Sequence, residues 1–389
     1  MRELDDLRKE IDEIDEEILS LYERRMETAR QVGELKKESG MKVYDPIREK
    51  ELMDRKMSSL PDPALKRGAR RLFELLMQCS RQQQYAVGAM PDPVKKAGFD
   101  GYLSKVSASR NPVANPLVLY QGQPGAYGEE AAVRFFGEDA RRSNRKDFEE
   151  VFQSLHEGIG DYGVVPIENN STGSIGSVYD LLGKYGCFIV GEQVVPVDHC
   201  LMAPKGADLS TITDVYSHEQ GFQQSEPFLK GHGDWNRRMM ANTAESARFV
   251  KDCGDVTKAA IASRRAADLY GLEILAESIN FNTENHTRFA VVSKVMELRE
   301  GSNKISTMFT VSHESGSLHR MIAIFAMRGM NLLKIESRPI IGKTWEYLFF
   351  ADLSGNLNSE GMESLIFELI EESHSFEVLG NYIGAGGGE

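Results

Sequence analysis

The sequence predicts a multi-domain chain: an all-α domain, an α/β domain with two lobes, and a small α+β domain. Three observations lead to this prediction. Apolar residues among the first forty positions recur every seven residues, as in a long helix that packs on another. From residue 117, short apolar strands alternate with helices. The last eighty residues follow the order strand, helix, strand, strand, helix, strand.

The length and composition are typical of a soluble protein with two or three domains. A chain of 389 residues is too long for one typical domain. The net charge of −13 argues against binding to nucleic acid. No apolar run approaches the ~20 residues that cross a membrane, and the N-terminus has no apolar secretory segment. We therefore expect a cytoplasmic protein that binds neither nucleic acid nor a membrane.

The four cysteines form no recognisable metal or disulfide pattern. Cys79, Cys187, Cys200 and Cys253 are scattered, without a Cys-x-x-Cys pair. His199 stands beside Cys200, but no second pair is spaced to complete a site. We expect reduced thiols and no metal.

Residues 1 to about 40 are predicted to form one long helix that ends at Gly40. Its apolar positions fall in two seven-residue registers: Leu4, Ile11, Ile18 and Val32 in one, and Leu7, Ile14, Leu21 and Leu35 in the other. Arg25 and Thr28 stand where apolar residues are due, and Arg24 is beside them. A polar interruption of an apolar seam sets the register or builds a site. A solvated arginine pair is the alternative.

Two further helices complete the all-α domain, one from Asp45-Pro46 through Met57 and one from Ala64 to about Val87. On the latter, Ser80 and Gln84 are four residues apart and share a face. Three helices give too thin a core for a monomer of ~90 residues. We therefore expect an intertwined dimer.

Residues 1 to about 88 resemble the all-helical chorismate mutases. The matching positions are Arg8, Arg24, Lys36, Asp45, Arg48, Glu49, Ser80 and Gln84. Chorismate carries two carboxylates and rearranges to prephenate without proton transfer. The resemblance thus implies a site that clamps the substrate and stabilises negative charge on the breaking ether oxygen. Arginines suit the carboxylates, while Lys36 and Gln84 are expected to donate to the ether oxygen.

Arg8 and Arg24 cannot meet at one ligand from a single helix. The sixteen residues between them correspond to ~24 Å along the axis. A dimer in which one subunit lends Arg8 to its partner's site removes this difficulty.

Residues 91–115 are rich in Gly, Ser, Asn and Pro without a sustained period, and we interpret them as a linker. Residues 116–294 then predict two α/β lobes around a cleft. Strands are expected at 117–120, 164–167, 188–196, 199–203, 215–220, 239–242, 259–263 and 289–292. The strand at 164–167 leads through the polar segment Glu168–Ser174 into a helix, an arrangement that often holds an anion or a small polar ligand. An ordinary connection with a capping hydroxyl is the alternative.

This region resembles the prephenate dehydratases, whose two lobes are like those of periplasmic binding proteins. The resemblance is carried by Val165-Pro166-Ile167-Glu168-Asn169 and by the Asn-x-Thr-Arg-Phe motif at 285–289. It implies substrate binding by Asn169, Asn170, Ser171, Ser217, His218, Gln220, Asn285, Arg288 and Phe289. Asn170 and Gly128 depart from the family, which mostly has hydroxyl residues there.

The dehydratase reaction needs one proton at a ring hydroxyl as carbon dioxide leaves. The resemblance assigns catalysis to Thr287 and substrate binding to Arg288. Because a threonine alone is a weak acid, Glu168 is the alternative proton source. Thr287 and Arg288 could also form an exposed pair at a strand start, and His218 could be a core or capping histidine.

The last region, 304–384, predicts strands at 304–313, 332–340, 345–353 and 376–383 and helices at 316–328 and 359–372. This order is ferredoxin-like and resembles the ACT domain appended to these dehydratases. The resemblance implies L-phenylalanine as effector, in contact with Leu318 and Asn331 across a dimer interface. The implied effector residues are Gly316, Leu318, Asn331, Glu336, Ser337, Arg338 and Pro339. Ser315 and Ser317 depart from the usual Pro and Ala.

The predicted domains are a chorismate mutase at 1–90, a linker at 91–115, a prephenate dehydratase at 116–294 and an ACT regulatory domain at 304–384. Together they imply a bifunctional enzyme of phenylalanine biosynthesis that takes chorismate through prephenate to phenylpyruvate. It would need no cofactor, would be inhibited by L-phenylalanine, and would form a homodimer or homotetramer.

Three other interpretations compete with this one. A mutase joined to a prephenate dehydrogenase would need a Gly-x-Gly-x-x-Gly turn, which we do not find. A two-lobed sensor would tolerate Thr287→Val, whereas the enzyme would lose dehydratase activity. If the helical domain is only a dimerisation arm, Arg24→Ala should leave chorismate turnover at background.

Overall fold

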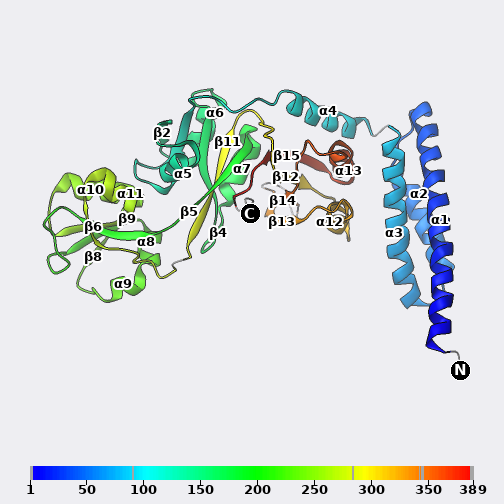
Figure 1. Ribbon diagram of the computed structural model, residues 1–389, viewed down its shortest axis with the longest axis horizontal. Coiled ribbons are helices and arrows are strands. Elements are labelled where there is room, and N and C mark those ends of the chain that lie inside the picture. Colours follow the sequence, from blue (N-terminus) through cyan, green and yellow to red (C-terminus); the bar gives the residue numbers. More distant parts are fainter. Residues whose placement is uncertain (1–2, 90–91, 283, 341, 343–345, 386–389) are drawn as a thin grey trace.

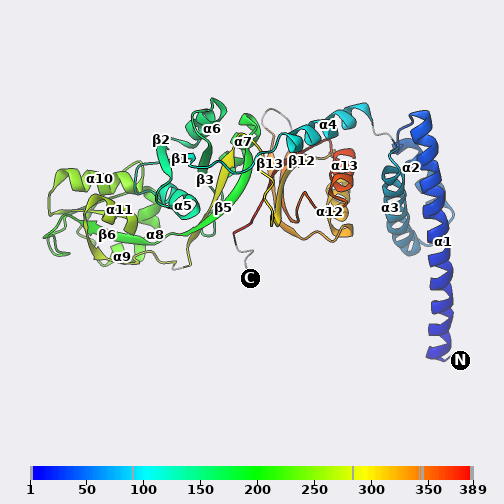
Figure 2. The same cartoon turned by 45° about the horizontal axis from the view of Figure 1, so that its top comes forward.

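The computed structural model describes residues 3–89, 92–282, 284–340, 342 and 346–385. Three N-terminal helices stand at one end of an elongated molecule, and two α/β lobes stand at the other (Figures 1 and 2). The C-terminal sheet and its helices lie between them, although they come last in the sequence. No helix in the described ranges combines the length and apolar character that a bilayer crossing needs.

The N-terminal helices begin and end where the sequence predicts. They are α1 (Leu4–Ser39), α2 (Pro46–Ser58) and α3 (Pro63–Ala86). Gly40 ends α1 in the left-handed conformation, with φ of 65°. Asp45 and Asp62 cap α2 and α3, and each is followed by a proline in the first turn.

The apolar seam of α1 is largely uncovered. The N-terminal part of the helix projects beyond α3 in both views (Figures 1 and 2). Every seam residue is at least 38% exposed: Leu4, Leu7, Ile11, Ile14, Ile18, Leu21, Val32 and Leu35. A row of this kind on a protruding helix is typical of a surface that another helix covers.

The first lobe is a six-stranded sheet in the order β2-β1-β3-β11-β5, with β4 paired to β3. Its strands are β1 (Leu117–Gln121), β2 (Arg141–Arg145), β3 (Tyr162–Asn169), β4 (Gly173–Ser174), β5 (Phe188–Pro196) and β11 (His286–Ser293). Its helices are α5 (Tyr127–Phe136), α6 (Phe148–His156) and α7 (Gly176–Tyr185). The strand predicted at 164–167 is parallel to β1 as expected, but it is antiparallel to β11 on its other side.

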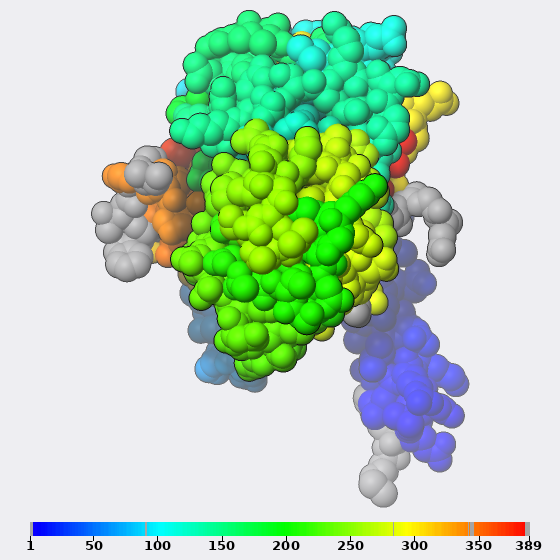
Figure 3. Space-filling view, turned by 90° about the vertical axis from the view of Figure 1, so that its left-hand side faces the viewer, coloured from blue at the N-terminus to red at the C-terminus, as the bar shows by residue number. Residues whose placement is uncertain are grey.

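The second lobe is a five-stranded sheet in the order β10-β6-β9-β7-β8. Its strands are β6 (His199–Ala203), β7 (Asp214–Ser217), β8 (Asn236–Met239), β9 (Lys258–Ser263) and β10 (Glu273–Ala276). Its helices are α8 (Glu219–Gln224), α9 (Glu226–Lys230), α10 (Thr243–Cys253) and α11 (Arg264–Tyr270). The chain enters this lobe after β5 and returns as β11, and Figure 3 shows the lobe in green and yellow-green below the first lobe. The prediction of two α/β lobes is confirmed.

The C-terminal unit has the predicted order of elements. They are β12 (Lys304–Thr310), α12 (Ser317–Met327), β13 (Leu332–Pro339), β14 (Tyr347–Ser354), α13 (Met362–Glu372) and β15 (Ser375–Tyr382). The sheet is antiparallel, in the order β13-β14-β12-β15. Phe350, Leu379 and Tyr382 share a core with Val165 and Ile167, so this unit and the first lobe are packed as one body. The strand predicted from 345 begins at 347, and Trp345 itself lies outside the described residues.

Residues 93–107, inside the segment interpreted as a linker, form the helix α4 (Pro93–Ser107). Asp92 caps it by accepting a hydrogen bond from the Val94 amide at 2.9 Å. The helix packs against α13 and β15, where Gly98 lies against Ile370. The sequence pattern did not predict this helix, because contacts with another domain stabilise a helix that has no apolar period of its own. The predicted boundary at residues 90–91 lies outside the described residues.

Candidate active sites

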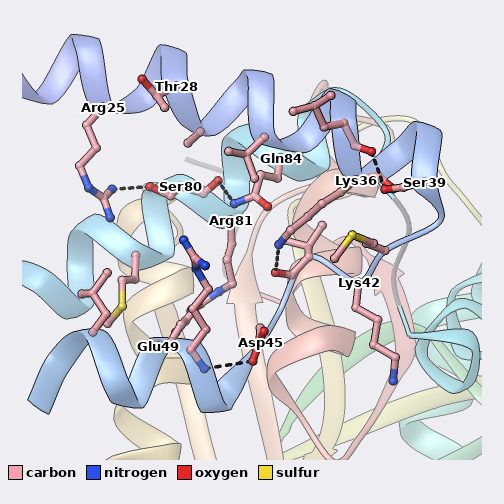
Figure 4. A pocket seen from close by; sticks show the side chains of 18 of the residues that line it. Arg25, Thr28, Lys36, Ser39, Lys42, Asp45, Glu49, Ser80, Arg81 and Gln84 are labelled. Atoms are coloured by element: carbon pink, nitrogen blue, oxygen red, sulfur yellow. Dashed lines mark hydrogen bonds and ion pairs between the residues drawn. The ribbon is translucent and has the colours of Figure 1, made fainter.

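A cavity of about 720 Å³ opens between α1, α2 and α3 (Figure 4). Eight charged side chains line it: Arg24, Arg25, Lys36, Lys42, Arg48 and Arg81 as cations, and Asp45 and Glu49 as carboxylates. The rest of the wall includes aliphatic side chains of α1 such as Leu21, Val32 and Leu35. The excess of cations in a partly apolar enclosure suits a small ligand that carries two negative charges.

This cavity collects seven of the eight residues predicted for the mutase site. They are Arg24, Lys36, Asp45, Arg48, Glu49, Ser80 and Gln84. Arg8 is the exception, since it lies on the protruding part of α1 and forms an exposed ion pair with Asp5 at 3.3 Å. The separation of Arg8 from Arg24 is the one expected for a single helix.

The polar groups of α1 and α2 are held by local contacts. Lys36 Nζ donates to the carbonyl of Val43 at 2.7 Å, and burial lowers the pKa of this lysine. Asp45 accepts a hydrogen bond from the Arg48 amide at 3.0 Å. Asp45 therefore also acts as the N-cap that fixes the start of α2.

The α3 side of the cavity depends on a close approach of two helices. Gln84 Nε2 donates to the Ser80 carbonyl at 3.2 Å, while Gln84 Oε1 is buried without a partner among the described residues. A Cβ at Gly33 would lie 2.7 Å from the Cα of Gln84. Only glycine allows α1 to pass so near, and this approach places Gln84 at the cavity wall.

Two arginines in the cavity were not predicted as site residues. Arg25 donates to the Leu76 carbonyl at 2.5 Å and to Ser80 Oγ, and burial lowers the pKa of its guanidinium. Arg81 donates to both carboxylate oxygens of Glu49 at 2.6 Å. The interrupted seam pointed to Arg25, whereas nothing in the sequence pattern singled out Arg81.

A second polar cluster surrounds Thr287 in the first lobe. Asn169 Nδ2 donates to Thr287 Oγ1 at 2.9 Å and to Asn285 Oδ1 at 2.8 Å. Thr287 is 8% exposed, and Asn285 Nδ2 is buried with no partner among the described residues. Because Asn169 already donates to Thr287, the hydroxyl proton of Thr287 is available for another acceptor.

The polar segment after β3 folds around the same cluster. Asn169 Oδ1 accepts hydrogen bonds from the amides of Ser171 at 2.9 Å and Thr172 at 3.1 Å. Ser171 Oγ donates to Asn285 Oδ1 at 3.2 Å. Asn170 Oδ1 accepts from the His286 amide at 2.9 Å, which joins the segment to the start of β11.

Glu168 and Arg288 lie on the opposite face of the sheet from Thr287. Side chains alternate along a strand, so Asn169 and Thr287 share one face while Glu168 and Arg288 share the other. Arg288 is 3.7 Å from Glu168 and 3.9 Å from Glu192, and Lys334 of β13 is 3.6 Å from Glu168. The structure therefore does not bring either residue to the Thr287 hydroxyl.

The remaining residues of the predicted dehydratase site are distributed over both lobes. Ser217 is fully buried in the second lobe and donates to the Ile261 carbonyl at 3.0 Å. His218 Nδ1 accepts from the Gln220 amide at 3.2 Å, so the interpretation of His218 as a capping histidine is confirmed. Phe289 is only 3% exposed and packs in the hydrophobic core.

The two predicted effector motifs have different neighbours. Leu318 lines a cavity of about 350 Å³ with Tyr347 and Phe349, and Gly316 is the N-cap residue before α12, with φ of 88°. The C-terminal half of β13 consists of Glu336-Ser337-Arg338-Pro339. Within it, Arg338 forms an ion pair with Asp180 of α7 at 3.1 Å. Asn331 precedes β13 and is exposed.

Two family models match separate parts of the chain. The family model described as Chorismate mutase type II matches residues 7–85, and that described as Prephenate dehydratase matches residues 118–297. A bifunctional chorismate mutase/prephenate dehydratase from Aquifex aeolicus is 32% identical over 383 residues, which cover 98% of both chains.

Solved structures resemble the part that follows the helical domain. Prephenate dehydratase from Arthrobacter aurescens, in complex with L-Phe, has a TM-score of 0.64 and 28% identity, over 70% of this chain and 91% of that one. GqqA, described as a novel type of quorum quenching acylase, has a TM-score of 0.63 and 26% identity, over 69% of this chain and 98% of that one. This chain also contains the helical domain, which matches the chorismate mutase model. It therefore belongs to the family of bifunctional chorismate mutase/prephenate dehydratases.

Proposed function

We propose that α1–α3 rearrange chorismate to prephenate and that the two-lobed domain converts prephenate to phenylpyruvate. The observation that carries the first step is the cationic cavity, where seven residues of the mutase pattern meet. Arg24 and Arg48 would bind the carboxylates, because guanidinium groups bind carboxylates in pairs of hydrogen bonds. Lys36 and Gln84 would donate to the ether oxygen as negative charge develops there.

The mutase site is completed by a second copy of the chain. The uncovered seam of α1 supports a dimer in which Arg8 of one subunit reaches the cavity of the other. This assembly explains why one arginine of the pattern stands apart from the other seven residues.

Mixing two inactive variants tests the shared site. Arg8→Ala and Arg24→Ala would each lack mutase activity, but a mixed dimer would have one intact site. Subunit exchange should restore up to about a quarter of wild-type activity, since half of the dimers are mixed and half of their sites are intact. As a control, Arg24→Ala mixed with Lys36→Met should restore nothing, because every site then has one defect. Absence of restoration in the first mixture would contradict the shared site.

In the dehydratase step we assign the proton donor to Thr287. Asn169 holds the hydroxyl oxygen at 2.9 Å and leaves its proton free to move to the departing ring hydroxyl. Glu168 is less suitable because its side chain lies on the other face of the sheet. Ser171 and Asn285 are joined to Thr287 through Asn169, and Asn170 binds the neighbouring His286 amide; these three are the binding residues that we propose in the first lobe.

The C-terminal unit is assigned as an ACT domain that binds L-phenylalanine and inhibits the enzyme. Its ferredoxin-like strand order and the cavity beside Leu318 support this role. Isothermal titration with L-phenylalanine should show saturable heat that Leu318→Asp removes. If the wild-type chain gives no heat, the effector role is wrong. A cytoplasmic enzyme is consistent with the metabolic role.

One chromatographic experiment tests both reactions. The purified chain is incubated with chorismate, and prephenate and phenylpyruvate are followed with and without L-phenylalanine. Phenylpyruvate that forms more slowly with phenylalanine is the expected result. Prephenate that accumulates alone would remove the dehydratase assignment, and unchanged chorismate would reduce α1–α3 to a dimerisation arm.

A further inference from the structure

Arg81 touches two domains at once. Its Nη1 donates to both carboxylate oxygens of Glu49 at 2.6 Å, inside the mutase cavity. Its Nη2 lies 3.8 Å from Oε2 of Glu372, at the end of α13 in the C-terminal domain. Its guanidinium lies over the Tyr44 ring, 5.1 Å from the ring centre. One side chain therefore joins a residue of the cavity to a domain that comes last in the sequence.

The outer contact of Arg81 is shielded from water, and the Glu49 side chain on the inner side is 25% exposed. The side chains of Arg81 and Glu372 are only 14% and 10% exposed. Glu372 is itself held by Arg320 of α12. Charged groups that are removed from water interact strongly with their neighbours, and the loss of one partner leaves the others uncompensated.

We propose that Arg81 is a positioning residue of the mutase cavity, and that Glu372 of the C-terminal domain holds Arg81 in place from outside. The inference rests on the proposed role of Glu49 in binding chorismate. An unpaired Glu49 would repel a substrate with two carboxylates. Arg81 compensates this charge and fixes the carboxylate, which can still accept a hydrogen bond from a substrate hydroxyl. The C-terminal domain thereby contributes to the mutase reaction without touching the substrate.

A matched pair of variants on α13 tests the outer contact. Glu372→Gln removes the charge that faces Arg81. Glu368 lies on the same helix and also faces α3, where its carboxylate accepts a hydrogen bond from Gln82 Nε2 at 3.0 Å. Glu368→Gln removes this charge. We expect Glu372→Gln to raise the mutase KM for chorismate about threefold at unchanged kcat, a loss of uniform binding. Glu368→Gln should leave KM unchanged, and both variants should turn over supplied prephenate like the wild type. Equal effects of the two variants on KM would overturn the proposal, because they would reflect domain docking alone.

A double-mutant cycle tests the inner contact. Arg81→Met should lower the mutase kcat/KM about tenfold on its own but less than about twofold in a Glu49→Gln background, if Arg81 acts through Glu49. Additive losses would overturn the positioning role while leaving the site assignment intact. An unchanged kcat/KM in Glu49→Gln itself would overturn the site assignment, and the inference with it.

The conservative variant guards against misfolding of Arg81→Met. Arg81→Lys keeps the charge, but one ammonium group cannot pair with Glu49 and Glu372 as the two guanidinium nitrogens do. We expect it to recover most of the kcat/KM that Arg81→Met loses and to be insensitive to Glu372→Gln. If Glu372→Gln lowers the kcat/KM of Arg81→Lys further, Glu372 does not act through Arg81, and the proposal is contradicted.

Discussion

In the helical cavity, long charged side chains from three helices surround an open space, whereas around Thr287 short amide and hydroxyl side chains bind one another. The charged side chains of the helical cavity, most of which are cations, line the space that a ligand would fill. The Thr287 cluster uses nearly all of its hydrogen bonds internally and leaves one hydroxyl proton and the Asn285 amide available. The reactions differ in the same way, because one needs charge stabilisation and the other needs a single placed proton.

The two sites also differ in how they are completed. The cavity holds seven of its eight expected residues and lacks Arg8, which lies along an uncovered helix. The members of the Thr287 cluster all come from one chain: β3 and β11 supply Asn169 and Thr287, the segment between β3 and β4 supplies Ser171, and Asn285 directly precedes β11. Assembly is therefore expected to control the mutase more directly than the dehydratase.

The sharpest test of this contrast is removal of one hydroxyl. Thr287→Val keeps the shape of the side chain but has no proton to donate, so dehydratase kcat should fall by about 10²–10⁴-fold. Thr287→Ser restores a hydroxyl and should recover a large part of the activity. Both are measured as phenylpyruvate formation from supplied prephenate. Mutase activity should stay unchanged in both variants, and a dehydratase that survives Thr287→Val would break the assignment.

A second test uses pH. The donor that we propose in the helical cavity, Lys36, is titratable, whereas the proposed donor in the second cluster is the hydroxyl of Thr287. Burial lowers the pKa of Lys36, and the ammonium form is the one that can stabilise negative charge. Mutase kcat/KM should therefore fall about tenfold per pH unit above the lowered pKa of Lys36, which lies below the ordinary lysine value of about 10.4. Lys36→Arg stays charged and should abolish this fall. If the wild type and Lys36→Arg have the same pH profile, Lys36 is not the cause of the fall in mutase kcat/KM.

The smallest expected effect comes from the spacing of α1 and α3. A methyl group at Gly33 would meet the backbone of Gln84 and the side chain of Val87 at 2.7 Å. Gly33→Ala should therefore destabilise the helical domain by about 1–3 kcal/mol and displace Gln84. Thermal unfolding and mutase kinetics measure these effects, with dehydratase activity as the internal control. Normal mutase activity in Gly33→Ala would show that the cavity tolerates a wider helix spacing.

The sequence predicts α1–α3 to within a few residues because their ends depend on local chemistry. Gly40 takes a left-handed conformation, and Asp45-Pro46 combines a cap with a residue suited to the first turn. In contrast, α4 and the charged strand β2 are stabilised by partners from other parts of the chain. Such partners leave no local period to detect.

The candidate sites divide in the same way. The heptad interruption led to Arg24 and Arg25 because a missing apolar residue is visible in the sequence itself. The opposite orientations of Thr287 and Glu168 depend on strand pairing, and a β-bulge shifts the register between Arg288 and Phe289. The contact of Arg81 with Glu372 joins residues almost three hundred positions apart, which no local pattern encodes.

The contacts between α3 and α13 also set an order of events during synthesis. Gln82 and Glu368, which form one of them, are 286 positions apart. A ribosome that adds ~5–20 residues per second needs about 15–60 s to pass from one to the other. During this interval α1–α3 have left the ribosome with the apolar seam of α1 uncovered. If the helical domains pair as proposed, they can do so before α13 is translated, and the last domain then joins a dimer that already exists.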